Sequence, residues 1–219
     1  MSRTLLRHAA ALALAGLVLL LWSHSGLDLR ISALAYSPGQ RAFPLRDAWL
    51  FAVLGHSALK YFAVSLWGAL LVIAAAAPRW RRIALHAWAG MTLVAFAVAG
   101  LRELSAHSCP WDLAQFGGTA QWFPPFGAVP PEPGPGRCLP AAHASSGFAL
   151  FALYFALRDA HPRLARAALA LAWALGLAAG AVQVVRGAHF ASHALWTAWI
   201  AWALNIALYA LIRRLKPPG

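Results

Sequence analysis

The chain has 219 residues, of which 61% are hydrophobic and 11% are charged, and its formal net charge is +12. This composition excludes an ordinary soluble domain and indicates a polytopic membrane protein. In a soluble protein so much positive charge would suggest nucleic acid, but in a membrane protein basic residues first report topology, so no nucleic-acid partner is expected.

Six apolar runs are about as long as a membrane-spanning helix. They cover residues 5–22, 57–77, 83–101, 143–158, 164–185 and 190–212. The sequence therefore predicts an all-α protein with six transmembrane helices, forming one transmembrane domain over residues 1–219. No internal repeat and no separate soluble domain is visible.

The basic residues predict the orientation of these spans. An even number of spans places both termini on one side, and eleven of the eighteen Lys and Arg residues fall on that side: Arg3, Arg7, Arg79, Arg81, Arg82, Arg158, Arg163, Arg166, Arg213, Arg214 and Lys216. Because cytoplasmic loops are enriched in Lys and Arg, both termini are expected in the cytoplasm, and the other side is expected to face the periplasm of a bacterial inner membrane. The first run lacks a clear small-residue cleavage site, which favours a retained helix over a signal peptide.

Two longer segments are expected on the outer side. The second half of residues 23–56, DAWLFAVLGHS, is apolar enough to lie along the membrane surface. The segment from about residue 105 to 140 contains eight prolines, so we expect an irregular, Pro-rich cap loop there. Cys109 and Cys138 lie near its two ends, and in an oxidising periplasm a disulfide between them would fix the base of the loop; two free thiols are the alternative.

Polar residues collect where the fifth and sixth runs meet. Gln183, Arg186, His189 and His193 follow one another at steps of three, three and four residues, which places them on one side of a helix, and Gly187 is expected to let the chain turn. Ionisable residues inside a membrane usually serve a function.

Two further polar groups are expected at the same depth. Arg102 ends the third run, Arg137 precedes the fourth and His143 begins it. Arginine and histidine at one depth suit a phosphate site, because guanidinium groups neutralise its oxygens and imidazoles attack phosphorus or protonate a leaving group. For Arg102 or Arg137 alone, an anchor at the membrane interface is an equally good interpretation.

These segments resemble the three motifs of the type-2 phosphatidic acid phosphatase superfamily, K-x6-R-P, P-S-G-H and S-R-x5-H-x3-D. Arg102 and Cys109-Pro110 fit the first motif, Pro140 to His143 fit the second, and His189 fits the histidine of the third. Gln183 replaces the motif arginine and His193 replaces the aspartate. The resemblance covers about residues 49–213, and the stretches CPWDL, GRCLPAAHAS and RGAHFASHALWT look like a branch in which such departures are usual.

The resemblance implies a six-helix lipid phosphatase without a cofactor or metal. His189 would attack phosphorus and form a phosphohistidine, and His143 would protonate the leaving group. His193 would accept the hydrogen bond from His189, with Asp112 as a candidate for the missing carboxylate. Phosphate binding would fall to Arg102, Arg186 and Arg137, with Gln183 in support.

The expected activity is hydrolysis or transfer of a lipid phosphate at the periplasmic face. Polyprenyl diphosphate, phosphatidic acid, phosphatidylglycerol phosphate and lipid A phosphates are the substrates that the resemblance implies. One alternative is a family member that binds lipid phosphate without catalysis. Another is metal or haem binding by His143, His189 and His193, which the nearby arginines disfavour because they would repel a cation.

Overall fold

The structure is a computed structural model that describes residues 3–215, apart from the side chains of residues 3, 4 and 54–56. Lys216, which contributes to the predicted orientation, lies outside the described residues. The described part is all-helical and holds α1 (Arg3–His24), α2 (Leu27–Ala35), the π-helix η1 (Leu50–Ala58), α3 (Leu59–Ala76), α4 (Arg81–Glu103), the 3-10 turns η2 (Pro110–Asp112) and η3 (Ala114–Phe116), α5 (Ala142–Phe148), α6 (Phe151–Leu157), α7 (Pro162–Val185) and α8 (Ala191–Leu215).

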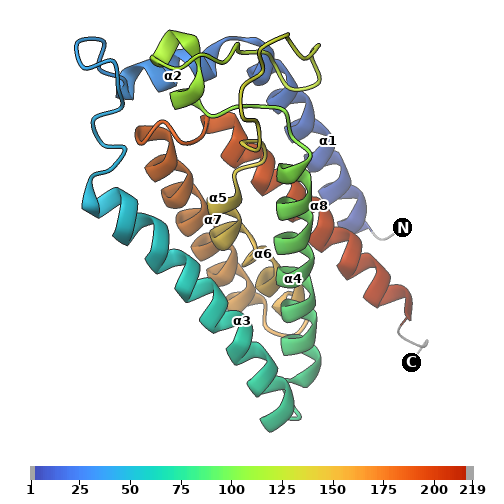
Figure 1. Ribbon diagram of the computed structural model, residues 1–219. Coiled ribbons are helices and arrows are strands. Elements are labelled where there is room, and N and C mark those ends of the chain that lie inside the picture. The colour runs from blue at the N-terminus through green and yellow to red at the C-terminus, as the bar shows by residue number, and fades with distance from the viewer. Residues whose placement is uncertain (1–2, 216–219) are drawn as a thin grey trace.

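Five of the helices are long and apolar enough to cross a membrane, namely α1, α3, α4, α7 and α8. The fourth predicted span is divided into α5 and α6, and the whole stretch Ala142–Leu157 is only about 24 Å long at about 1.5 Å per residue. These two short helices lie inside the bundle and contact α4, α7 and α8 (Figure 1). The structure is that of a polytopic membrane protein, with five long helices around a shorter central pair.

The central pair is held by close packing against α7. A Cβ atom added to Gly147 would lie 2.3 Å from the backbone nitrogen of Gly176, so the two helices approach at a distance that only glycine permits. Phe148 and Phe151 are completely buried at the junction between α5 and α6. This packing fixes the beginning of α5 beside the end of α7.

The predicted surface segment, residues 47–57, is not a separate element of the fold. From Leu50 the chain is already helical, and η1 continues directly into α3 along the same rod (Figure 1). No proline interrupts the sequence between Pro44 and Pro78, so nothing in it stops the helix from extending outward. The outer segment instead contains the short helix α2, which lies across the end of the bundle.

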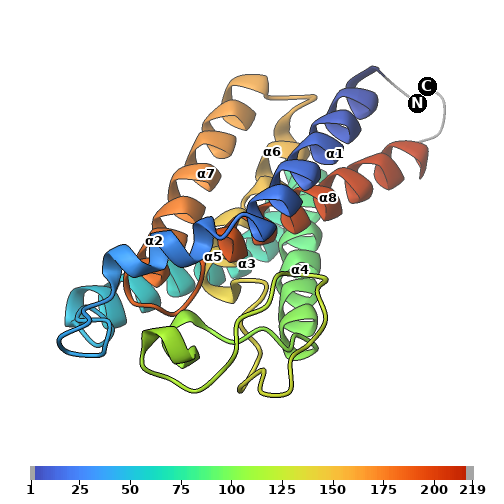
Figure 2. The ribbon, with the colours of Figure 1, turned by 90° about the horizontal axis from the view of Figure 1, so that it is seen from above.

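The bundle has two distinct ends. The beginning of α1 and the end of α8 lie at the same end, and Figure 2 shows these two helices side by side. At the other end lie α2 and residues 104–141, which form no helix longer than one 3-10 turn. We call residues 104–141 the cap loop.

Candidate active site

Three chain segments meet beneath the cap loop. Arg102 lies in the last turn of α4, His143 in the first turn of α5, and His189 in the turn between α7 and α8. The ring centroids of His143 and His189 are 6.0 Å apart. The structure therefore brings together residues that are about 40 to 90 positions apart in the sequence.

The turn between α7 and α8 is tightly built. Gly187 has a φ of 71°, and a Cβ atom there would lie 2.4 Å from the ring of Phe43. The backbone N–H groups of Ala188 and His189 both donate to the carbonyl oxygen of Gln183, at 2.9 and 3.2 Å. The N–H of Trp111 in the cap loop donates to the carbonyl of Gly187 at 3.0 Å. The backbone that carries His189 is thus fixed from both sides.

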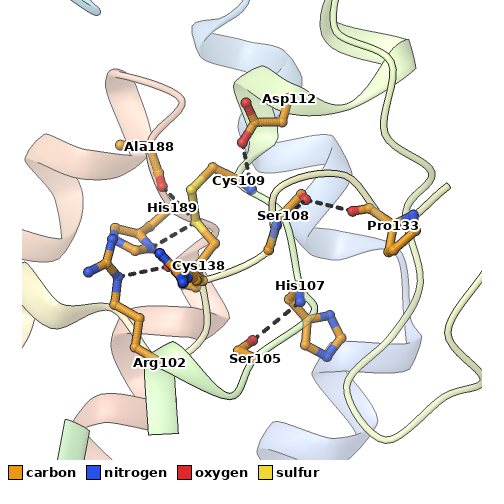
Figure 3. Close-up of a disulfide and its surroundings, with 12 residues drawn as sticks. Arg102, Ser105, His107, Ser108, Cys109, Asp112, Pro133, Cys138, Ala188 and His189 are labelled. Atoms are coloured by element: carbon orange, nitrogen blue, oxygen red, sulfur yellow. Dashed lines mark hydrogen bonds between the residues drawn. A yellow bond between two sulfur atoms is a disulfide. The ribbon is translucent and has the colours of Figure 1, made fainter. Parts of the chain in front are cut away.

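A disulfide joins Cys109 to Cys138, with an S–S distance of 2.05 Å. It links the two ends of the cap loop above the turn, as Figure 3 shows. The N–H of Cys138 also donates to the carbonyl of His107 at 2.9 Å, and the N–H of Arg137 donates to the carbonyl of Ser105 at 2.7 Å. These contacts place the backbone of Cys138 directly against the imidazole of His189.

The tautomer of His189 follows from this contact. Its Nδ1 atom is 2.8 Å from the carbonyl oxygen of Cys138 (Figure 3). A carbonyl oxygen can only accept a hydrogen bond, so Nδ1 carries the proton and donates it. In the neutral ring, Nε2 then holds the free lone pair.

His189 is kept neutral by its surroundings. Only 4% of its surface is exposed, and burial lowers its pKa from 6.5 to about 4. The hydrogen bond to Cys138 raises the pKa, while the positive charge of Arg102 lowers it. At neutral pH the ring is therefore uncharged, which is the form in which an imidazole can act as a nucleophile.

Neither of the two residues expected to take the place of the motif aspartate accepts the hydrogen bond from Nδ1 of His189. The ring centroids of His189 and His193 are 6.0 Å apart, and the Nδ1 atom of His193 has no hydrogen-bond partner among the described residues. The carboxylate of Asp112 accepts a bond from the N–H of Cys109 at 3.3 Å (Figure 3). The hydrogen bond that was assigned to His193 is instead made by the carbonyl of Cys138.

The predicted arginines differ in what holds them. The Nε of Arg102 donates to the carbonyl of Arg137 at 2.7 Å, which directs its guanidinium toward His189 (Figure 3). The side chain of Arg137 is mostly exposed and forms an ion pair with Glu103 at 3.2 Å. Glu103 also lies 3.9 Å from Nη1 of Arg102, but the charge of Arg102 acts on His189, so Arg102 is the better placed of the two for an anion there.

Arg186 and Gln183 form a pair on the other side of the turn. Arg186 donates from Nη1 to Oε1 of Gln183 at 3.2 Å, and from Nε to the carbonyl of Arg46 at 2.8 Å. Gln183 is 1% exposed, and its Nε2 has no partner in the part of the chain that the structure describes. Because buried polar groups are nearly always hydrogen-bonded, this amide is a donor available to a bound oxyanion.

Asp28 was missed by the sequence analysis. Its carboxylate accepts bonds from the N–H of Ser192 at 3.0 Å, from the hydroxyl of Ser192, and from Nε1 of Trp22 at 3.0 Å. It therefore caps the beginning of α8 from another part of the chain, although burial raises its pKa. No local pattern signals this role, because Asp28 and Ser192 are 164 residues apart.

Metal coordination finds little support in this geometry. Among the described residues, the one cluster with the right ligand types is Cys109, Cys138 and His189. Both sulfur atoms are in the disulfide, so neither is a thiolate, and Nδ1 of His189 is bonded to a carbonyl. The donor set does not fit a metal.

Helix ends that bring arginine and histidine together inside a membrane bundle define a site suited to phosphoryl transfer. A family model described as the PAP2 superfamily matches residues 83–217, more than half of the chain, and the protein belongs to this superfamily. The resemblance identified from the sequence is confirmed. Comparisons with curated proteins and with solved structures give no match. Members of the superfamily are generally phosphatases, which places this protein among phosphatases and phosphotransferases of lipid phosphates.

Proposed function

We propose that this protein hydrolyses or transfers a lipid phosphate at the periplasmic face of a bacterial inner membrane, through a phosphohistidine on His189. The observation that carries the proposal is the bond from Nδ1 of His189 to the carbonyl of Cys138. It leaves the lone pair on Nε2 of a neutral imidazole, which is the atom and the state that nucleophilic attack requires.

The Cys138 carbonyl does part of the work of the motif aspartate. It fixes the tautomer and the ring orientation, and its negative oxygen end stabilises the positive charge that develops on the ring during attack. A carbonyl carries no net charge, so the stabilisation is smaller than that from a carboxylate. Retained catalysis without the motif aspartate is therefore physically reasonable.

The reaction has two displacement steps. Nε2 of His189 forms a bond to phosphorus while the bond from phosphorus to the leaving oxygen breaks, and His143 donates a proton to that oxygen. Water then attacks the phosphohistidine, His143 takes a proton from it, and inorganic phosphate leaves. If a lipid hydroxyl replaces the water, the same intermediate yields a phosphotransferase.

Phosphate binding is assigned to the donors around the turn. Arg102 and Arg186 supply positive charge to the non-bridging oxygens, and Nε2 of Gln183 supplies one further hydrogen bond. Gln183 stands at the position of the motif arginine. Because Arg186 donates to its side chain, a guanidinium group lies next to that position. Arg137 contributes through the carbonyl that holds Arg102.

The orientation has two supports. A disulfide persists in an oxidising compartment, which favours a periplasmic location for the cap loop. The Lys and Arg residues concentrate at the opposite end, which favours a cytoplasmic location for the termini. The site then lies at headgroup level, where a lipid phosphate is within reach.

The test is to trap labelled phosphate on purified protein. We expect a ³²P-labelled lipid phosphate to give an acid-labile, base-stable phosphoenzyme, and we expect His189→Gln to abolish both the adduct and phosphate release. His24→Gln, which changes an exposed histidine on α1, is the matched control and should retain both. Binding of the lipid without any adduct would instead indicate a non-catalytic family member, and turnover by His189→Gln would exclude His189 as the nucleophile.

A further inference from the structure

A cavity lies at the end of the bundle that carries the termini, opposite the end that holds His189. It has a volume of about 690 Å³ and lies between the beginning of α4, the end of α6 and the end of α8. This volume falls within the range of about 300 to 1,000 Å³ that is typical of small-molecule sites. No part of the proposed reaction uses it.

Arginines surround the mouth of this cavity. Arg79, Arg82 and Arg213 line it, and Asp159 is the one acidic residue among its lining residues. Arg213 donates to the hydroxyl of Tyr209 at 2.9 Å, and that hydroxyl donates to Asp159 at 2.9 Å. The single negative charge is thus already engaged.

Arg79 and Arg82 remain available to a ligand. Both are exposed, and within residues 3–215 no acidic side chain forms an ion pair with either of them. The loop that carries Arg79 is held in place, because the ring of Trp80 packs at a tilt against that of His161, with centroids 4.8 Å apart. Two exposed guanidinium groups, one on this loop and one on the adjoining helix, thus supply positive charge for an anion.

The walls of the cavity are mostly apolar. Ile83, Leu85 and Ala89 of α4 face Phe155 of α6 and Ile212 of α8 across it. From Arg82 to Ala89 the helix rises about 10 Å, so the apolar walls extend about two turns inward from the charged mouth. A ligand that fits has an anionic head and a hydrocarbon tail.

We propose that this cavity binds an anionic phospholipid from the surrounding leaflet. Its phosphate lies between Arg79 and Arg82, and its acyl chains lie along α4 and α8. Basic pockets between transmembrane helices recognise anionic lipid headgroups in this way. The surrounding bilayer supplies such a lipid directly. This bound lipid is not the substrate, because His189 lies at the opposite end of the bundle.

The experiment measures lipid retention and thermal stability of the full chain in a neutral detergent. Dioleoylphosphatidylglycerol is compared with dioleoylphosphatidylcholine and with inorganic phosphate, by native mass spectrometry and by the melting temperature. We expect a one-to-one adduct and a higher melting temperature with phosphatidylglycerol, and neither effect with the other two. Equal retention of both lipids, or equal stabilisation by inorganic phosphate, would overturn the proposal.

A matched pair of variants locates the site. Arg79→Gln with Arg82→Gln should weaken phosphatidylglycerol binding about 30-fold, from the loss of two arginines near the surface. Arg163→Gln with Arg166→Gln removes the same charge from exposed positions of α7 at the same end, outside the cavity, and should leave binding unchanged. Equal losses in the two double variants would show that net charge, and no particular cavity, attracts the lipid.

A third variant tests the apolar wall. Ala89→Phe fills the inner part of the cavity and leaves every arginine in place, so it should weaken retention of phosphatidylglycerol at an unchanged net charge. Circular dichroism and size-exclusion chromatography establish that each variant is folded before binding is compared. Undiminished binding by a folded Ala89→Phe variant would contradict the placement of the acyl chains.

Discussion

The two ends of the bundle use arginine in different ways. Beneath the cap loop, Arg102 and Arg186 are held by backbone carbonyls, around a histidine that is almost completely buried. At the other end, Arg79 and Arg82 are exposed beside an open cavity. On our proposals, this difference arises because catalysis requires groups fixed before the substrate arrives, whereas lipid binding requires only charge above an apolar wall.

The largest effect is expected from His143, the proposed general acid, because it should lower kcat without involving the other end of the bundle. His143→Gln removes the proton donor and should lower kcat about 100- to 10,000-fold for an alkyl phosphate, the usual range for such a group. A p-nitrophenyl phosphate needs little protonation of its leaving group, so its phosphoenzyme should form at a rate close to that of the unchanged protein. Equal losses for the two substrates would mean that His143 is not the acid.

The next effect compares arginines across the two ends. Arg102→Gln should lower kcat/KM about 10- to 150-fold, because it removes a charge-assisted contact worth about 1.5 to 3 kcal/mol. Arg82→Gln should leave kcat/KM unchanged, and Arg137→Gln should have a small effect because its guanidinium is paired with Glu103. Steady-state kinetics on one lipid phosphate measures all three, and similar losses for Arg102→Gln and Arg82→Gln would remove the distinction between the ends.

The disulfide tests whether the outer end depends on its rigid backbone. Replacing Cys109 and Cys138 together by alanine keeps the backbone carbonyl at position 138 but removes the disulfide that holds it in place. We expect about a 10-fold loss of kcat, at the low end for a group that orients a catalytic imidazole, because the N–H of Cys138 still bonds to His107. Binding of phosphatidylglycerol at the other end should not change. Full activity in the double variant would show that the disulfide does not position His189.

The smallest effect is on pH dependence. With a pKa of about 4, His189 is still about 90% neutral at pH 5, whereas an ordinary imidazole would be about 3% neutral. The rate of phosphoenzyme formation, corrected for ionisation of the substrate, should therefore stay nearly constant between pH 7 and pH 5. A loss centred near pH 6.5 would mean that burial does not keep the ring neutral.

Stability should respond to the same group with a definite sign. The pKa of His189 is lower in the folded than in the unfolded protein, so its neutral form favours folding above pH 6.5. That contribution is lost as the pH falls from 6.5 toward 4. The melting temperature should fall over this range, and less so in a folded His189→Gln variant.

Much of the fold could be predicted because apolar run length is a strong signal. The boundaries of α4, α7 and α8 lie within three residues of the predicted runs. The division into α5 and α6 was not visible, because Ala149 and Leu150 between them are ordinary helix formers and the interruption depends on packing inside the bundle. The outward extension of α3 was missed because an apolar stretch at the membrane surface and a longer helix have the same composition.

The sequence could predict the side chains of the candidate site, but not the backbone contact that orients His189. The sequence indicated the separate groups around Arg102, His143 and His189, but a backbone carbonyl that acts in place of an aspartate has no signature in the sequence. The hydrogen bond from His189 to His193 was predicted because the spacing of four residues was interpreted as one helical turn. His189 instead lies before α8 begins at Ala191, and its Nδ1 bonds to Cys138. The cap from Asp28 depends on tertiary contact alone.

The central claim is that His189 attacks through Nε2, because its Nδ1 proton is held by the Cys138 carbonyl. The most direct measurement is to trap the phosphoenzyme, digest it, and determine by mass spectrometry and ³¹P NMR which atom carries phosphorus, with both phosphohistidine isomers as standards. We expect phosphate on Nε2 of His189. Phosphate on Nδ1, or on any other residue, would contradict it.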